Sequence, residues 1–342
     1  MIHGHGDDLF NYPGIQCNFS SNIYAHADMT ELKAHLCRHI HLIGNYPEPS
    51  PRSLEMAIAS KYGVSADNIL VTNGATDAIY LIAQTFARKG CVHDDIGELP
   101  TFCEYGDACR MAGVTRWGGG EEDGVPASAV LRWVCNPNNP TGDVYTREEV
   151  EMLAQRYGIV VVDQSYEDFT LAPVMTHQEA ADSNNIIQIH SLTKKYAIPG
   201  LRVGYVVAPR HLIHSLRENI RPWSVNTLAI EAGKWLMEND VSHFPSLSAY
   251  LGETKRLSRM LSQIPGVTVH PTHTHFFLAE TEKGTAALLK DYLAKNHHLL
   301  IRDASNFQGL TPRHFRVSTQ SPEENDWLVA AIREYAEDDG QR

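Results

Sequence analysis

A lysine lies between two small hydroxyl residues and an arginine, directly after the apolar run 186–189. A lysine amine can form an imine with an aldehyde, and nearby cations or desolvation lower its pKa so that a neutral fraction exists. Ser191 and Thr193 stand three residues and one residue before Lys194, and Arg202 stands eight residues after it. These hydroxyl and guanidinium groups form a candidate clamp for a phosphate.

An imine-forming lysine beside such a clamp favours pyridoxal 5′-phosphate (PLP), which carries both an aldehyde and a phosphate. The alternative is a solvated Lys194-Lys195 pair in front of a buried strand. The lysine motif alone does not separate these two interpretations, because a motif is a hypothesis that its structural context must support.

Two polar segments further upstream supply part of that context. The stretch 136–142, rich in Pro and Asn, is typical of a turn, but it also places Asn139 after a strand, where α/β sheets bind ligands. The run 159–163 has the pattern of a buried parallel strand and ends in a carboxylate. Asp163 can cap the next helix or pair with a protonated pyridine nitrogen. Tyr166, three residues on, can hydrogen-bond the phenolic oxygen of the same ring.

A third segment predicts an anion site. The strand 69–72 runs into the small residues 73–77, which lead into the helical stretch 78–87. Small residues at a strand-to-helix turn expose backbone amides at the positive end of a helix, and such ends bind anions. Each segment is weak alone, but their order and spacing together favour a cofactor site.

Strands and helices alternate through the first two thirds of the chain. The strands expected there are 69–72, 131–135, 159–163, 186–190 and 203–208. This rhythm predicts an α/β fold whose large domain has a mostly parallel sheet covered by helices on both faces. Beyond residue 240 the pattern predicts a smaller α+β domain with helices 246–263, 285–295 and 322–337 and strands 267–270, 275–279, 299–302 and 315–318.

Bulk composition narrows the classes of partner. The net charge of −12 argues against nucleic acid and anionic membranes, because both reward basic patches. The N-terminus lacks a signal-peptide pattern and no run reaches the ~20 apolar residues of a spanning helix, so we expect a cytoplasmic location. The six cysteines show no zinc-like pairing and His3 and His5 form only a poor ligand pair. We therefore expect no metal site.

From the segment 44–47 to Arg316, the chain resembles the fold-type I, class I/II aminotransferase superfamily of PLP enzymes. Within that superfamily it is most similar to the histidinol-phosphate aminotransferases and the threonine-phosphate decarboxylases. The resemblance implies a large PLP-binding domain at 41–240, a small domain formed by 1–40 and 241–342, and active sites shared across a homodimer.

The resemblance also implies roles for single residues. Lys194 matches the Schiff-base lysine, Asp163 the partner of the pyridine nitrogen, and Tyr166 with Asn139 the pair that bonds the phenolic oxygen. Arg316 matches the arginine that grips the substrate α-carboxylate, for which a planar fork is well suited. The remaining implied contacts are Ser191, Arg202, Gly74, Ala75 and Thr76 for the phosphate, Phe102 for stacking on the ring, Tyr46 for the neighbouring subunit's phosphate, and Asn22 for the substrate.

The reaction stays open between two related chemistries. The first prediction is transamination of an amino acid or phosphorylated amine. The alternative is decarboxylation of threonine phosphate in cobalamin biosynthesis. The substrate bond that is held perpendicular to the ring decides which reaction occurs. A silent, cofactor-binding regulator is a third hypothesis, which the intact set of Lys194, Asp163 and Arg316 disfavours. Four further cationic groups favour a phosphorylated substrate: Arg302, Arg313, His3 and His5. The alternative is that they are surface residues of the small domain. His275 is expected to pack in a strand rather than reach the site.

Overall fold

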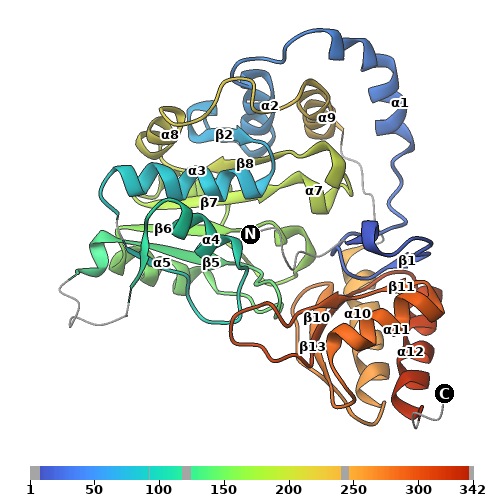
Figure 1. The fold of residues 1–342 in the computed structure, drawn as a ribbon. Helices are drawn as coiled ribbons and strands as arrows, with labels where there is room; N and C mark the ends of the chain where they lie inside the picture. Colours follow the sequence, from blue (N-terminus) through green and yellow to red (C-terminus); the bar gives the residue numbers. More distant parts are fainter. Residues whose placement is uncertain (1–7, 92, 118–124, 240–245, 339–342) are drawn as a thin grey trace.

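A computed structural model describes residues 8–91, 93–117, 125–239 and 246–338. The chain forms two lobes, and the larger is built on a seven-stranded sheet (Figure 1). In spatial order its strands are β2 (Ile69–Thr72), β8 (Gly204–Val207), β7 (Ile186–Ser191), β6 (Ile159–Asp163), β5 (Val130–Cys135), β3 (His93–Asp95) and β4 (Thr115–Arg116). Only β8 runs antiparallel to its neighbours, so the predicted mostly parallel sheet is confirmed.

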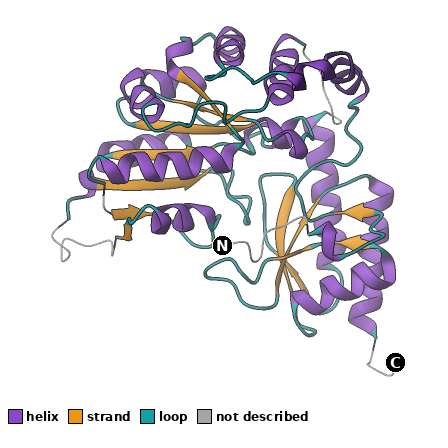
Figure 2. Cartoon of the chain, turned by 45° about the horizontal axis from the view of Figure 1, so that its top comes forward, coloured by secondary structure: helices purple, strands orange, loops and turns teal. Residues whose placement is uncertain are grey.

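Helices cover both faces of this sheet (Figure 2), which explains why its central strands are apolar throughout. Val160 and Val162 of β6 lie in one core cluster with residues of α2 and α9, whereas Val161 lies in the other with residues of α3 and α8. Successive side chains of a strand point to opposite faces, so a strand between two helical layers buries every position. The helices of this lobe are α2 (Arg52–Tyr62), α3 (Ala75–Arg88), α4 (Glu104–Met111), α5 (Arg147–Arg156), α6 (His177–Asp182), α7 (Leu192–Lys195), α8 (Arg210–Arg217) and α9 (Thr227–Glu238).

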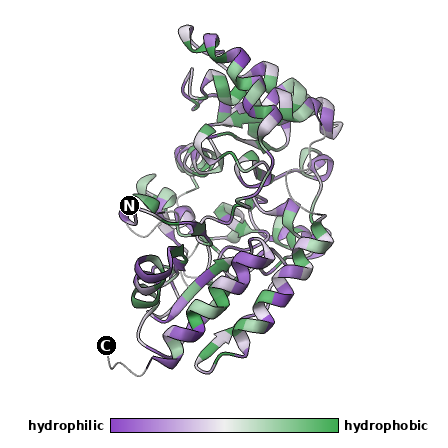
Figure 3. Ribbon diagram, turned by 90° about the vertical axis from the view of Figure 1, so that its right-hand side faces the viewer, coloured by the Kyte–Doolittle hydropathy of each residue, from purple (hydrophilic) through white to green (hydrophobic). Residues whose placement is uncertain are grey.

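The smaller lobe is an antiparallel sheet with helices packed against it. Its strands, in spatial order, are β12 (Arg302–Asp303), β13 (His314–Ser318), β10 (Phe276–Thr281) and β9 (Val267–Val269). Its helices are α10 (Leu247–Ser262), α11 (Ala286–His297) and α12 (Pro322–Glu337). Hydrophobic and hydrophilic residues alternate along these helices (Figure 3), as expected when one face of a helix covers a core.

One predicted strand of this lobe is divided. The stretch 299–302 was expected to be continuous, but β11 (Leu299–Leu300) pairs with β1 (Cys17–Asn18), whereas β12 pairs with β13. The chain changes sheet at Ile301, which is fully buried. Leu299, Leu300, Ile301 and Arg302 are all buried, so burial continues across the break and only the partner strands distinguish its two sides.

The N-terminal segment contacts both lobes. Cys17 and Phe19 belong to the core of the smaller lobe, whereas Leu32 of α1 (Thr30–His39) belongs to a core cluster of the larger one. Helix α1 packs against α9. The domain boundary at residues 40 and 41 stays a prediction, and this packing favours a boundary before α1. Among the described residues, no helix is long and apolar enough to cross a membrane.

Candidate functional site

A cavity of about 350 Å³ lies at the carboxyl ends of β5, β6 and β7, where the two lobes meet. Parallel sheets bind ligands at this edge because strand ends and helix N-termini converge there. The lining residues on the larger lobe include Ala75, Thr76, Phe102, Asn139, Asp163, Tyr166, Ser191, Thr193, Lys194 and Arg202. Ser20, Ser21, Arg302, Phe307 and Arg316 line it from the N-terminal segment and the smaller lobe.

Lys194 reaches the cavity from α7, the short helix that follows β7 directly. Its Nζ donates a hydrogen bond of 2.7 Å to the carbonyl oxygen of Ser21. The Nζ of the neighbouring Lys195 lies 2.5 Å from the Asp168 carboxylate.

Asp163 ends β6 and is almost fully buried at the cavity wall. Burial raises the pKa of this carboxyl group, but several donors oppose the shift. Ser165 donates from its hydroxyl (2.6 Å) and its backbone amide (3.0 Å) to Oδ1, and the Tyr105 hydroxyl donates to Oδ2 at 2.8 Å. A buried carboxylate held this way is suited to pair with a cationic ring N–H in the cavity.

A buried ion pair lies behind Asp163. His190 Nδ1 lies 2.7 Å from a Glu167 oxygen, and His190 Nε2 lies 3.2 Å from Gln188 Oε1. The Gln188 amide nitrogen donates to the Met175 carbonyl, so its oxygen must face His190. Both ring nitrogens of His190 therefore face oxygen acceptors. Burial opposes ionisation of Glu167, but the interaction with His190 lowers the pKa of Glu167 to about 2. The nearby His190 also acts to lower the pKa of Asp163.

Tyr166 and Arg316 form the opposite wall. Burial raises the pKa of Tyr166 to about 12, and its hydroxyl accepts a 3.2 Å hydrogen bond from Asn22 Nδ2. The neutral phenol therefore keeps its proton to donate. Arg316 donates to Asn139 Oδ1 and, at 2.6 Å, to the Ser20 carbonyl. Burial lowers the pKa of Arg316 to about 10, which still leaves the guanidinium charged at neutral pH.

The start of α3 forms the third side of the cavity and is suited to bind an anion. Gly74 precedes α3 with φ of +86°, and a Cβ on it would lie 2.7 Å from Arg202 Nη2. A Cβ on Gly204 would lie 2.8 Å from the backbone nitrogen of Ala75. The two glycines thus let the guanidinium and the strand approach the helix start closely. The positive end of a 14-residue helix and Arg202 converge there with Ser191.

The donors in this cavity fit PLP. Among the described residues, Thr193 Oγ1, Asn22 Oδ1 and Arg316 Nε are buried polar atoms with no hydrogen-bond partner. Such atoms are rare in folded proteins unless a ligand or water satisfies them. A phosphate fits the end formed by α3 and Arg202, a pyridinium fits Asp163, and an aldehyde fits Lys194.

Most residues predicted for the site are brought together, with three exceptions. Gly74 and Asn22 lie just behind the lining, next to Arg202 and Tyr166 respectively. Tyr46 lies outside the cavity; its side chain is 86% exposed and contacts the Trp223 ring at 5.6 Å between centroids. A single chain therefore does not test its expected contact with a neighbouring subunit.

The spare cations and His275 also have definite positions. Arg302 lines the cavity, Arg313 is exposed, and His3 and His5 fall outside the described residues. His275 is fully buried against Phe169, with ring centroids 4.0 Å apart, so the expectation that it packs rather than lines the cavity is confirmed. It lies directly before β10, however, and not within the strand as expected.

The sequence interpretation missed the groups that orient the site from a distance. Tyr105 lies 58 positions before Asp163, and the carbonyls of Ser20 and Ser21 bond residues 296 and 173 positions away. The role of Ser165 could have been predicted from the sequence, because an Asp followed two residues later by a serine often forms a local side-chain-to-backbone turn.

Two buried neutral histidines predict acid sensitivity. Burial lowers the pKa of His177 and of His275 to about 3, against about 6.5 in an unfolded chain. Below pH 6.5 the unfolded state binds protons that the folded state does not, so stability present above pH 6.5 is lost as pH falls toward 3. The expected slope is roughly 1.4 kcal/mol per pH unit for each histidine.

The free energy of unfolding in urea, measured between pH 6.5 and pH 5, gives this slope. Ordinary carboxyl groups titrate below that range and contribute little to it. His177→Phe should remove about half of it. A free energy of unfolding that is flat over this range in the wild type would contradict the assignment of both rings as neutral.

Comparison with known proteins agrees with this geometry. A family model described as "Aminotransferase class I and II" matches residues 123–332. The chain is 30% identical over 333 residues to threonine-phosphate decarboxylase of Salmonella typhimurium, covering 92% of this chain and 90% of that protein. It is 31% identical over 312 residues to histidinol-phosphate aminotransferase of Thermoanaerobacter sp., covering 84% of each.

A solved structure extends the likeness to the whole fold. The crystal structure of L-threonine-O-3-phosphate decarboxylase from Porphyromonas gingivalis superposes with a TM-score of 0.85 at 36% identity, covering 93% of this chain and 99% of that one. The match includes both lobes and hence the cavity between them. This chain belongs to the class I and II aminotransferase family of PLP-dependent enzymes.

Proposed function

We propose that Lys194 holds the cofactor covalently, that Asp163 pairs with its ring nitrogen, and that Arg202, Ser191 and the start of α3 bind its phosphate. When bound, PLP withdraws electrons from the substrate Cα as one of its bonds breaks. Tyr166 and Asn139 lie where they can bond the ring oxygen, and Phe102 can cover one ring face. Lys194 is the group that moves a proton at the reacting carbon.

The substrate we propose is an amine with two anionic groups. Arg302 and Arg316 are direct partners in the register of β12 and β13, and both line the cavity. Both are almost fully buried, and burial lowers the pKa of each guanidinium. Two buried cations are stabilised when anions occupy the space between them. We assign Arg316 to a carboxylate and Arg302 to a second anion such as a phosphate ester.

We propose decarboxylation of a phosphorylated amino acid as the reaction, which reverses the order of preference in the sequence interpretation. One support is the pair of arginines, because such a substrate carries a carboxylate and a phosphate at once. The other is the 36% identity to a threonine-phosphate decarboxylase over nearly the whole chain. Transamination is the second candidate, favoured by the 31% identity to a histidinol-phosphate aminotransferase; a glutamate donor also carries two carboxylates.

Product analysis distinguishes these reactions. With O-phosphothreonine, the expected product is CO2, with no keto product when an oxo acid is present. Formation of a keto acid or ketone from O-phosphothreonine or histidinol phosphate, without CO2, would establish transamination instead. Arg302→Gln should raise KM for the phosphorylated substrate by about 10- to 100-fold, the equivalent of losing a hydrogen bond to a charged group. The affinity for unphosphorylated threonine should be unchanged.

We also propose a homodimer with shared sites, and the surface around Tyr46 supports it. Ile40, Ile43, Tyr46 and Trp223 are exposed apolar residues, and the Trp223 amide bonds the Pro49 carbonyl near Tyr46. Neighbouring exposed apolar residues of this kind favour contact with another chain, and two-fold dimers are the commonest closed assembly. We propose that the Tyr46 hydroxyl reaches the cofactor phosphate of the partner.

Tyr46→Phe should weaken cofactor binding about ten-fold or more, the equivalent of ~1.5–3 kcal/mol for a hydrogen bond to a charged group. Sedimentation at micromolar concentration should show a dimer. Mixing inactive Lys194→Ala chains with chains disrupted at Tyr46 should restore activity, because a heterodimer regains one complete site. A fully active monomer would exclude shared sites.

A further inference from the structure

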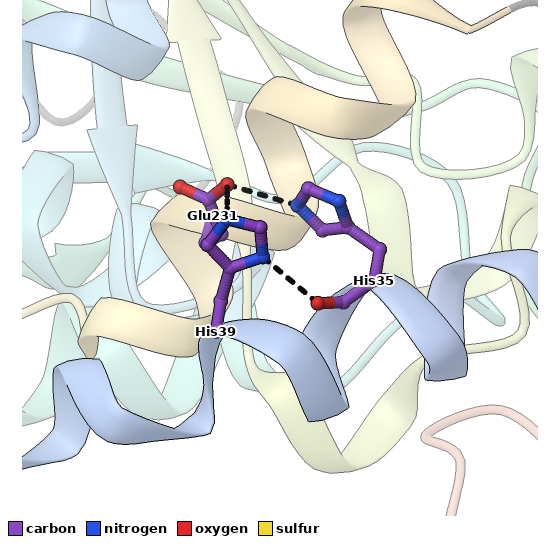
Figure 4. A group of neighbouring side chains, drawn as sticks. All are labelled: His35, His39 and Glu231. Atoms are coloured by element: carbon purple, nitrogen blue, oxygen red, sulfur yellow. Dashed lines mark hydrogen bonds and ion pairs between the residues drawn. The ribbon is translucent and has the colours of Figure 1, made fainter.

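Two histidines of α1 face a glutamate of α9, away from the cavity. His35 and His39 are four residues apart, so they lie on the same face of the helix. Figure 4 shows both rings turned toward Glu231. The Glu231 Oε1 atom lies 2.9 Å from His35 Nε2 and 3.9 Å from His39 Nε2. The three potential ligand atoms lie within 4.8 Å of one another.

These distances suit a metal ion at the centre of the group. In a tetrahedral Zn²⁺ site with bonds of about 2.0–2.1 Å, neighbouring ligand atoms are roughly 3.3 Å apart. One observed distance is shorter and the other longer, so small rotations of the side chains reach that arrangement. Lys234 Nζ lies 3.2 Å from Glu231 Oε2, the other carboxylate oxygen, and leaves Oε1 facing the histidines.

The ring of His39 is oriented as that of a ligand. Its Nδ1 lies 2.9 Å from the His35 carbonyl oxygen, which can only accept, so Nδ1 carries the proton. In the neutral ring, the Nε2 lone pair then faces Glu231. Histidines that bind metals almost always donate their second N–H in this way, which fixes the ring and its tautomer. His35 Nε2 donates to Glu231 in this structure, and binding an ion requires its proton to leave or to move to Nδ1.

Two other groups of described residues combine histidines with a glutamate, and neither is prepared for an ion. In the group His270, Glu280 and His314, the Thr311 backbone N–H donates to His314 Nδ1. Neutral His314 therefore carries its proton on Nε2, the atom facing Glu280. In the group Glu167, His177 and His190, both nitrogens of His190 already have hydrogen-bond partners, and that of Nε2 is Gln188, outside the group.

Exposure provides a route of entry. The side chains of His35 and Glu231 are 14% and 15% exposed, and that of His39 is 35% exposed. The group is thus closed on the α9 side and open beside His39. Three protein ligands with one open position leave room for a water molecule or a further ligand.

We propose that His35, His39 and Glu231 bind one Zn²⁺, which joins α1 to α9. Two imidazoles and a carboxylate favour a borderline ion such as Zn²⁺ over Mg²⁺ or Ca²⁺, which prefer oxygen ligands. Helix α1 follows the segment whose Ser20 and Ser21 carbonyls bond Arg316 and Lys194. An ion bound near the C-terminal end of α1 stabilises the packing of α1 on α9 of the larger lobe. The expectation that the chain lacks a metal site is thereby revised.

The test is Zn²⁺ binding to the holoenzyme after treatment with a chelator, measured by competition with a chromophoric chelator. One ion per chain is expected, with a concentration-dependent rise in Tm. His39→Gln and Glu231→Gln should each weaken binding at least ten-fold and abolish that rise. Co²⁺ should give the visible absorption of a tetrahedral site in the wild type and lose it in both variants.

Three matched controls should retain wild-type affinity. His270→Gln alters the second histidine–glutamate group, and a joint His3→Gln, His5→Gln replacement removes the N-terminal histidines. Cys37→Ser removes an exposed thiol two residues from each histidine of α1, a spacing of about 200° around the helix. Circular dichroism establishes that each variant is folded.

Either of two results would overturn the proposal. One is tight, stoichiometric Zn²⁺ binding that persists in both His39→Gln and Glu231→Gln. The other is wild-type binding no tighter than that of the Glu231→Gln variant, which would make the group an ordinary histidine–glutamate ion pair.

Discussion

Lys194→Ala is expected to abolish covalent attachment of PLP and to lower activity by several orders of magnitude while the chain still folds. The proposed roles of this amine, anchor and proton carrier, are both lost, and alanine can perform neither. The substitution removes the hydrogen bond from Lys194 Nζ to the Ser21 carbonyl. Mass spectrometry after borohydride reduction measures the attachment, and product formation measures the activity.

Lys195→Ala is the matched control. Its amine pairs with the Asp168 carboxylate, which raises the pKa of Lys195 and keeps it charged. We expect this variant to lose some stability and to keep its cofactor bond. Attachment that survives in Lys194→Ala and disappears in Lys195→Ala would show that the wrong lysine had been assigned.

Asp163→Asn is expected to retain the cofactor and to lower the rate by roughly two to four orders of magnitude, the range for losing one preorganised charged group. An amide has nearly the shape of the carboxylate, but it cannot hold the ring nitrogen protonated. The protein should therefore bind PLP without the electron withdrawal that the reaction needs. Single-turnover rates at equal cofactor content measure the loss.

Tyr105→Phe tests the same position more gently. It keeps the carboxylate and removes one of the donors to Asp163, so the pKa of Asp163 should rise. The rate should therefore fall at the acid limb of the pH profile, where Asp163 becomes protonated, and stay unchanged at higher pH. A rate for Asp163→Asn close to that of the wild type would remove this residue from the mechanism.

The sequence by itself determined the parts of the site that depend on short stretches of chain. Asp163 ends an apolar strand and Lys194 follows another, and strands buried between two helical layers are recognisable from continuous apolar runs. The anion site at the start of α3 could also be predicted from a short stretch of sequence, because a small-residue turn between a strand and a helix forms such a site without any distant contact.

The fold class was also determined locally, whereas the edges of its sheets were not. The five predicted strands of the large sheet are present, but β3 and β4 have three and two residues and no distinctive pattern. The division at Ile301 was invisible for a related reason. Its neighbours Leu300 and Arg302 are both buried, and the choice between β1 and β13 as partner depends on how the sheets are placed in space.

Only the tertiary structure decided which distant groups complete the site. Arg302 and Arg316 become neighbours because β12 and β13 pair in one register, and the Tyr105 hydroxyl meets Asp163 because α4 packs on the strand layer. The same holds for His39 and Glu231, which α1 and α9 bring together. Local patterns specify elements through backbone geometry and burial, but contacts between elements follow from packing of the whole chain, and no short stretch of sequence records them.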